Sequence, residues 1–258
     1  MTSIMGPEKR NAKGLRIFSA GLALGFWELG ARVIHNRLLL VGPIQTLTRL
    51  WSLLGQKTTW QAIAFTFSRI GLGFFLAFVL ALVLAGLAAA FPWAEVLLGP
   101  YVLAIQSVPV ASFIVIALLW LSGKRLSTFI SFLMVLPVLY SNALQGLKNA
   151  DPQLKEMAKV FRVPLLRQIP GIYLPALAPS LRSGCRVALG MCFKSGVAAE
   201  VIAVTSHSIG GMLYDAKVYL EISDLFAWTL IIVILSLCFE KAFLWLLDRV
   251  FFLVQGSL

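Results

Sequence analysis

The sequence has few charged residues and few of the residues from which catalytic and metal sites are built. Only 13% of its 258 residues are charged, against about 25% in soluble domains. The two histidines, His35 and His207, lie far apart, and no cysteine has a partner at metal-ligand spacing. No Walker-type phosphate loop, nucleophile elbow or HExxH motif occurs. We therefore expect that the chain is not an enzyme and holds no cofactor and no metal.

Apolar residues dominate instead, at 59% of the chain, with a mean hydropathy of +0.89. A run of about 20 apolar residues can cross the hydrocarbon core of a bilayer as a helix. We predict an all-α, multi-pass membrane protein with about six such helices, at about 15–34, 66–91, 99–121, 126–146, 177–204 and 224–250. The segment 44–62 is too polar to span, so we expect an interfacial helix there.

Basic residues lie mostly between the apolar runs. The chain has 22 Lys and Arg against 11 Asp and Glu, which gives a net charge of +11. A nucleic-acid-binding domain would carry such charge on a solvated face, so we expect no nucleic-acid partner. Lys and Arg between spans mark cytoplasmic loops. The basic N-terminal segment and the loop 147–176 are therefore predicted to be cytoplasmic, which puts both termini on that side of the bilayer.

Charge is most concentrated in the segment 151–175, DPQLKEMAKVFRVPLLRQIPGIYLP. Asp151 followed by Pro152 is typical of a helix start, and Pro164 should end that helix. Its apolar side chains are expected to form one stripe, made of Leu154, Met157, Ala158 and Phe161. A second short helix should follow and be broken by Pro170, Gly171 and Pro175. Periodicity alone is equally typical of a helix lying on anionic lipid.

The spacing of this segment resembles the cytoplasmic loop of ABC importer permeases, which has the form E-A-A, three residues, G, nine residues, I-x-L-P. Here Glu156, Met157 and Ala158 begin the motif, and Ile172, Leu174 and Pro175 follow at the expected offsets. Met157 replaces an alanine, and Arg162 stands where the family usually has glycine. The resemblance implies an ATPase-coupling site made of Asp151, Pro152, Leu154, Glu156, Met157, Ala158, Phe161, Arg162, Ile172, Leu174 and Pro175.

Further segments between residues 60 and 245 are similar to the nitrate/sulfonate/taurine branch of these permeases. They include Gly73 and Phe74 at the start of the second span, and Asn142 and Gly146 before the loop. The segment PSLRSGCRVALGMCFKSGVAAEVIAV after the loop keeps the branch's pattern of Pro, Gly, aromatic-Lys and Ala-Glu. The order and spacing of these pieces together carry the resemblance.

The resemblance implies a fold, a location and a set of partners. The fold is that of type I ABC importer permeases in the bacterial cytoplasmic (inner) membrane. Residues 1–59 would hold an N-terminal tail, the first span and the interfacial helix, residues 60–245 the transmembrane domain, and residues 246–258 a C-terminal tail. The partners would be ABC ATPase subunits that bind ATP and Mg, a second permease copy in a homodimer, and an extracytoplasmic substrate-binding protein.

The solute and the transport class leave alternatives open. Small anions such as sulfonates, nitrate or taurine are typical of this branch, and vitamin precursors are the second alternative. A self-sufficient secondary transporter or channel would usually show an inverted repeat, and no internal repeat stands out. A membrane scaffold without transport activity is a third possibility.

Two charged residues lie inside the fifth predicted span, Lys194 and Glu200. A charge near the bilayer centre costs about 2.5–3.5 kcal/mol even on the lenient insertion scale, so it normally meets a partner or water. Either residue could bond a neighbouring helix and fix its packing. Alternatively, both line the translocation pathway of an anionic solute.

Overall fold

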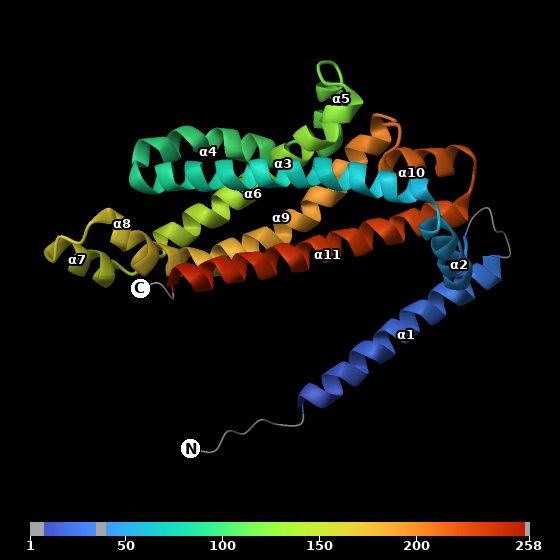
Figure 1. The fold of residues 1–258 in the computed structure, drawn as a ribbon, viewed down its shortest axis with the longest axis horizontal. Coiled ribbons are helices and arrows are strands. Elements are labelled where there is room, and N and C mark those ends of the chain that lie inside the picture. The colour runs from blue at the N-terminus through green and yellow to red at the C-terminus, as the bar shows by residue number, and fades with distance from the viewer. Residues whose placement is uncertain (1–7, 35–39, 256–258) are drawn as a thin grey trace.

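The computed structural model describes residues 8–34 and 40–255, and this part of the chain is built from helices and loops without a strand (Figure 1). The all-α prediction is confirmed. The helices are α1 (Glu8–Ile34), α2 (Pro43–Leu54), α3 (Lys57–Ala90), α4 (Pro92–Ser107), α5 (Val110–Ala117), α6 (Gly123–Lys148), α7 (Pro152–Val160), α8 (Leu165–Gln168), the π-helical turn η1 (Ile169–Tyr173), α9 (Leu174–Ile202), α10 (Ile209–Val218) and α11 (Ile222–Gln255).

The centre of the fold is the packing of α6 against α3 on one side and α9 on the other, with α11 on α9. Alanines on α3 let the helices approach closely, since Ala77, Ala81 and Ala85 are fully buried. Larger core side chains fill the space around them: Ile70, Phe74, Leu139, Leu189 and Phe193. Figure 1 shows α7 and α8 at one end of this bundle and α10 at the other. The two ends therefore present different surfaces.

Within the described residues, three helices are long and apolar enough to cross a bilayer, namely Lys57–Ala90, Arg125–Lys148 and Ile222–Val254. The bent pair α4 and α5 raises the number to four if it counts as one span. The expected number of about six is therefore not confirmed by length and composition. α9 does not qualify because it carries four charged residues, Arg182, Arg186, Lys194 and Glu200. α11 neutralises the two arginines, through Asp248 at 3.0 Å from Arg182 and Glu240 at 3.2 Å from Arg186.

The prediction of one continuous span at 99–121 was wrong. The chain forms α4 and α5 instead, which meet at an angle of 97° across the break at residues 108–109. Val108 is extended there, with φ −84° and ψ 132°. Proline disfavours helical backbone in the residue before it and has no N–H to donate, so Pro109 ends α4 and caps α5. Pro137, by contrast, is held inside α6, as expected.

Some expected boundaries shift. The interfacial helix ends at Leu54, and residues 57–62 belong to α3, so the boundary at residue 60 falls inside that helix. At the other end, α11 runs to Gln255, and residues 246–255 extend a helix rather than forming a tail. Residues 1–7 and 256–258 of the expected tails lie outside the described residues.

Candidate functional site

The predicted helix start at Asp151 and stop at Pro164 are confirmed in α7. The Asp151 carboxylate accepts a hydrogen bond from the backbone N–H of Gln153 at 2.8 Å, and Pro152 occupies the first helical position. The side-chain cap satisfies one backbone donor that the first turn leaves without a helical partner. Pro164 follows the turn that ends α7 and caps α8. Local residues alone therefore fix the start of this nine-residue helix.

The end of α7 is a left-handed turn centred on Arg162, which has a φ of 52°. The N–H of Val163 donates to the carbonyl of Ala158 at 2.9 Å, and that of Arg162 donates to Lys159 at 3.2 Å. These two bonds form the Schellman motif, in which glycine is the usual left-handed residue. Arg162 therefore keeps the backbone geometry of the glycine that it replaces, at a steric cost of about 1–2 kcal/mol.

Replacing Arg162 by glycine should therefore stabilise the protein by up to about 1 kcal/mol, because glycine adopts a positive φ without a Cβ penalty. Differential scanning calorimetry of the purified protein measures the change. The matched control is Arg167→Gly, since Arg167 lies in the helical turn α8 and does not have a positive φ. That change should lower the stability by about 0.5–1 kcal/mol. Equal effects of the two changes would contradict strain at Arg162.

The surface of α7 carries apolar side chains that nothing in the described chain covers. We call Leu154, Met157, Val160, Phe161 and Leu165 the α7 patch, and each is at least 40% exposed. Phe161 and Val160 are the most exposed, at 74% and 77%. Ala158 was expected in the same stripe, but its side chain is only 2% exposed and does not belong to the patch. Glu156 is exposed and has no ion-pair partner among the described residues.

The second half of the motif lies beside α7 rather than on it. Ile172 belongs to η1, and Leu174 and Pro175 open α9. The expected break at Pro170, Gly171 and Pro175 is absent, since the chain stays helical from α8 through η1 into α9. In a π turn each N–H bonds to the carbonyl five residues back, so one extra residue fits into the turn without ending the helix. The ammonium of Lys155 lies 5.8 Å from the ring of Tyr173, which ties α7 to this turn.

Glu200 connects three helices. Its side chain is fully buried, and its Oε2 accepts hydrogen bonds from the Thr66 hydroxyl at 2.8 Å and the Gly210 N–H at 3.2 Å. The Thr66 hydroxyl in turn accepts from the N–H of Ile209 at 2.9 Å. The other carboxylate oxygen, Oε1, has no partner among the described residues. This arrangement links α9 to α3 and α10, and it favours the packing alternative for Glu200.

Thr66→Val tests that link, because it removes a buried hydroxyl that serves both Glu200 and Ile209 while keeping its shape. It should destabilise the protein by about 1–3 kcal/mol, since the carboxylate and the N–H lose a buried partner. Thr59→Val on the same helix is the control. The Thr59 hydroxyl is buried without a partner, so its removal should be neutral or stabilising. Melting temperatures in detergent that fall equally in both variants would argue against the link.

The structure does not bring Lys194 and Glu200 together. Lys194 is exposed on α9, whereas Glu200 has no exposed surface in the described chain. Neither is among the residues that line the main groove of the molecule. A pathway role for the two residues stays a prediction.

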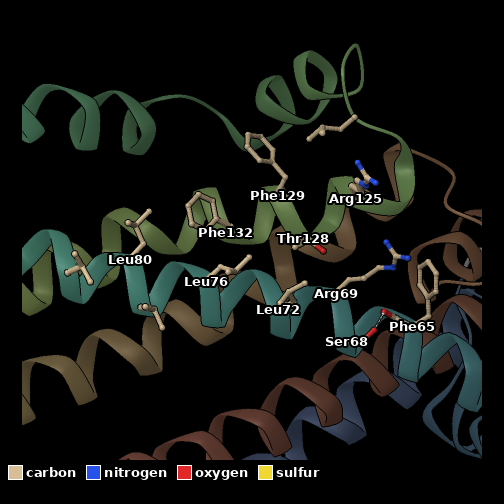
Figure 2. A pocket seen from close by; sticks show the side chains of 13 residues that line it. Phe65, Ser68, Arg69, Leu72, Leu76, Leu80, Arg125, Thr128, Phe129 and Phe132 are labelled. Carbon is tan, nitrogen blue, oxygen red and sulfur yellow. Dashed lines mark hydrogen bonds between the residues drawn. The ribbon is translucent and has the colours of Figure 1, made fainter.

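The main groove was not expected from the sequence. It has a volume of about 930 Å³ and runs along α3 and α6. Figure 2 shows the side chains of Arg69 and Arg125 at one end of it and leucine and phenylalanine side chains along the rest. Arg69 interrupts one apolar run and Arg125 comes directly before another, and these positions were the signal that the sequence offered. Their proximity could not be read from the sequence without knowing that α3 packs on α6.

Comparison with known proteins gives a consistent result. Residues 73–251 match the family described as the binding-protein-dependent transport system inner membrane component. The putative aliphatic sulfonates transport permease of Bacillus subtilis is 25% identical over 92% of this chain and 85% of its own length. The taurine transport system permease of Escherichia coli is 24% identical over 83% of this chain and 80% of its own. The bicarbonate transport system permease of Synechococcus elongatus is 22% identical, over 72% and 67%.

Proposed function

Because the chain belongs to the family of binding-protein-dependent transport system inner membrane components, in its nitrate/sulfonate/taurine-like branch, we propose that it imports a small anion as the permease subunit of an ATP-driven transporter. The permease role follows from the family. The solute class is supported by three relatives whose names specify sulfonates, taurine and bicarbonate, which are anions or carry an anionic group.

The single observation that best supports the ATP-driven mechanism is the α7 patch. Five exposed apolar side chains lie on α7 and the turn into α8, and α7 is capped at its start and closed by a Schellman motif at its end. A rigid helix with an apolar face is suited to docking in a groove of a partner protein. The matching motif spacing points to an ATPase subunit as that partner, with ATP and Mg bound there. Closure of two ATPase subunits would then move α7 and the spans joined to it.

The remaining partners follow from the same role. A second copy of the chain would complete the pathway as a homodimer, and an extracytoplasmic binding protein would deliver the solute. We place the complex in the bacterial inner membrane with α7 and both termini in the cytoplasm. Figure 1 supports opposite sides for α7 and α10, which lie at opposite ends of the bundle.

Cysteine labelling tests that orientation. A cysteine at position 155 on α7 should react with a membrane-impermeant maleimide only in inside-out vesicles, and one at position 215 on α10 only in right-side-out vesicles. Cys238 is exposed and is replaced by serine in both variants, whereas Cys185 and Cys192 are buried. Labelling of position 155 in right-side-out vesicles would reverse the orientation.

Co-purification tests the function itself. The tagged chain, extracted from its native membrane in mild detergent, should bring down a protein with a Walker motif. The reconstituted complex should take up a radiolabelled anion only with ATP, and taurine, an alkanesulfonate, nitrate and bicarbonate are the competitors to compare. A heterocyclic vitamin precursor without an anionic group is the control. Uptake driven by an ion gradient without ATP would establish the secondary transporter instead.

A further inference from the structure

The groove between α3 and α6 has a charged end and an apolar length. Arg69 and Arg125 line one end, together with the hydroxyl-bearing Thr128. Apolar side chains line the rest: Leu72, Leu76, Val79, Leu80, Phe129 and Phe132. Figure 2 shows Arg69 reaching up from α3 and Arg125 lying at the start of α6, at the same end of the groove. The groove thus combines a cationic pocket with an apolar wall.

Helix packing gives Arg69 and Arg125 similar positions along the axes of α3 and α6. The start of α4, which follows α3, is joined to the end of α6 by the ion pair Glu95–Lys148, so α3 and α6 end at the same side and run in parallel. A Cβ added to Gly73 would lie 2.5 Å from the carbonyl oxygen of Thr128, so these residues face each other. Arg69 and Arg125 each lie about one helical turn earlier.

Neither arginine is neutralised by a carboxylate of the described chain. Arg69 lies over the ring of Phe65, 3.9 Å from its centroid, and Arg125 has no ion-pair partner among the described residues. Among the described residues, three other arginines are paired with a carboxylate on another helix, namely Arg49 with Asp224, Arg182 with Asp248 and Arg186 with Glu240, whereas Arg249 is not. A pocket with two unpaired guanidinium groups is complementary to an anion from outside the chain.

The backbone beside α6 is irregular, which argues against contact with lipid at that point. α4 and α5 both pack on α6, and the helical backbone is broken between them at residues 108–109. Irregular backbone at membrane depth is tolerated where protein buries it or where it lines a water-filled cavity, but not against lipid. Arg125 is the first residue of its span, at the end opposite to α7. In the proposed orientation, the arginines lie at the extracytoplasmic mouth of the groove.

We propose that Arg69 and Arg125 bind the anionic head of the transported solute at this mouth, while the apolar wall of the groove holds its aliphatic body. The solute class is therefore an organic anion with an aliphatic chain, such as an alkanesulfonate. This inference rests on the proposed function, since it names the solute and the residues that select it. The Thr128 hydroxyl makes no side-chain hydrogen bond within the described chain and is free to donate to the same head group.

Protection of a cysteine in the groove tests the proposal. Ser68→Cys, which lies in the groove beside Arg69 and leaves Thr128 intact, is introduced with Cys238→Ser into the full chain, which is assembled with its ATPase in phosphatidylcholine nanodiscs. A water-soluble maleimide should label the cysteine, and 1-hexanesulfonate should block labelling while 1-hexanol does not. With Arg69→Gln or Arg125→Gln, the half-protecting concentration of hexanesulfonate should rise by at least about tenfold, the loss expected for a charge-assisted hydrogen bond.

Arg249→Gln is the matched control. Arg249 also lies beside an aromatic ring without an ion-pair partner in the described chain, 5.5 Å from the centroid of Trp245, but it is on α11 and outside the groove. Its replacement should leave the half-protecting concentration unchanged. Equal protection in all three arginine variants would overturn the proposal. All variants are first required to elute and melt like the parent protein, so that misfolding is excluded.

Two other occupants give distinct results, and each would overturn the proposal. If a second copy of the chain fills the groove, the cysteine stays unlabelled in the dimer without any solute. If an anionic lipid fills it, phosphatidylglycerol in the nanodisc blocks labelling and hexanesulfonate has no further effect. Failure of the proposed function is a separate observation, because it would appear as missing ATPase or as uptake without ATP. ATP-driven uptake with no role for the arginines would remove the site and keep the function.

Discussion

Replacing Gly73 by leucine is expected to abolish recovery of folded protein. Gly73 is buried where α3 packs closely on α6. A Cβ there would lie 2.5 Å from the Thr128 carbonyl oxygen, 3.0 Å from the Cβ of Ser131 and 3.2 Å from the Phe132 nitrogen. Two of these are backbone atoms, which cannot move aside without separating the helices. Overpacking of this kind costs about 3 kcal/mol or more, and the yield of monodisperse protein on size exclusion should fall at least about tenfold.

Gly86→Leu is the control for that result. Gly86 lies on the same helix, is exposed, and has nothing within 4 Å of an added Cβ. Leucine favours a helix interior over glycine by somewhat under 1 kcal/mol, so this variant should be as stable as the parent or slightly more so. A similar loss of yield in both variants would show that insertion into the membrane, rather than the contact of α3 with α6, limits folding.

Local sequence chemistry accounts for the parts of the fold that were predicted correctly. Asp151, Pro152 and Pro164 act within one or two turns of the backbone, so the limits of α7 followed from them alone. The same holds for the helical state of the long apolar runs. Arg162 is an intermediate case, because the motif spacing identified the special position and only the backbone showed that arginine adopts the glycine conformation there.

Features that depend on packing between distant segments were missed. A proline inside an apolar run is compatible with a continuous helix, as Pro137 shows, or with a sharp break, as Pro109 shows. The choice depends on what the neighbouring helices offer. Ala158 belongs to the expected apolar stripe by its spacing, but its side chain is only 2% exposed, unlike the other members of the stripe. The proximity of Arg69 to Arg125 arises from the contact of α3 with α6, which no single stretch of sequence encodes.

Phe161→Ala is expected to detach the ATPase subunit while leaving the permease folded. The Phe161 ring is 74% exposed, so its loss removes little packing from this chain. If the α7 patch docks in a groove of the ATPase, the same ring becomes a buried aromatic anchor. Truncation of such an anchor costs about 2 kcal/mol or more, which corresponds to about 30-fold weaker binding. Titration of the ATPase onto permease nanodiscs measures the affinity, and ATP-driven uptake should fall with it.

Tyr219→Ala is the matched control, because it also truncates an exposed aromatic ring at the end of a short helix. Tyr219 caps the end of α10 as Phe161 caps the end of α7, and it is 73% exposed. It lies at the opposite end of the bundle, so its loss should leave ATPase affinity unaltered. Glu156→Lys adds an independent change on α7, since reversing an exposed charge there should weaken docking without unfolding the helix. If Phe161→Ala and Glu156→Lys both bind the ATPase like the parent, α7 is not the docking helix. Its apolar patch would then face lipid, as its periodicity alone also allows.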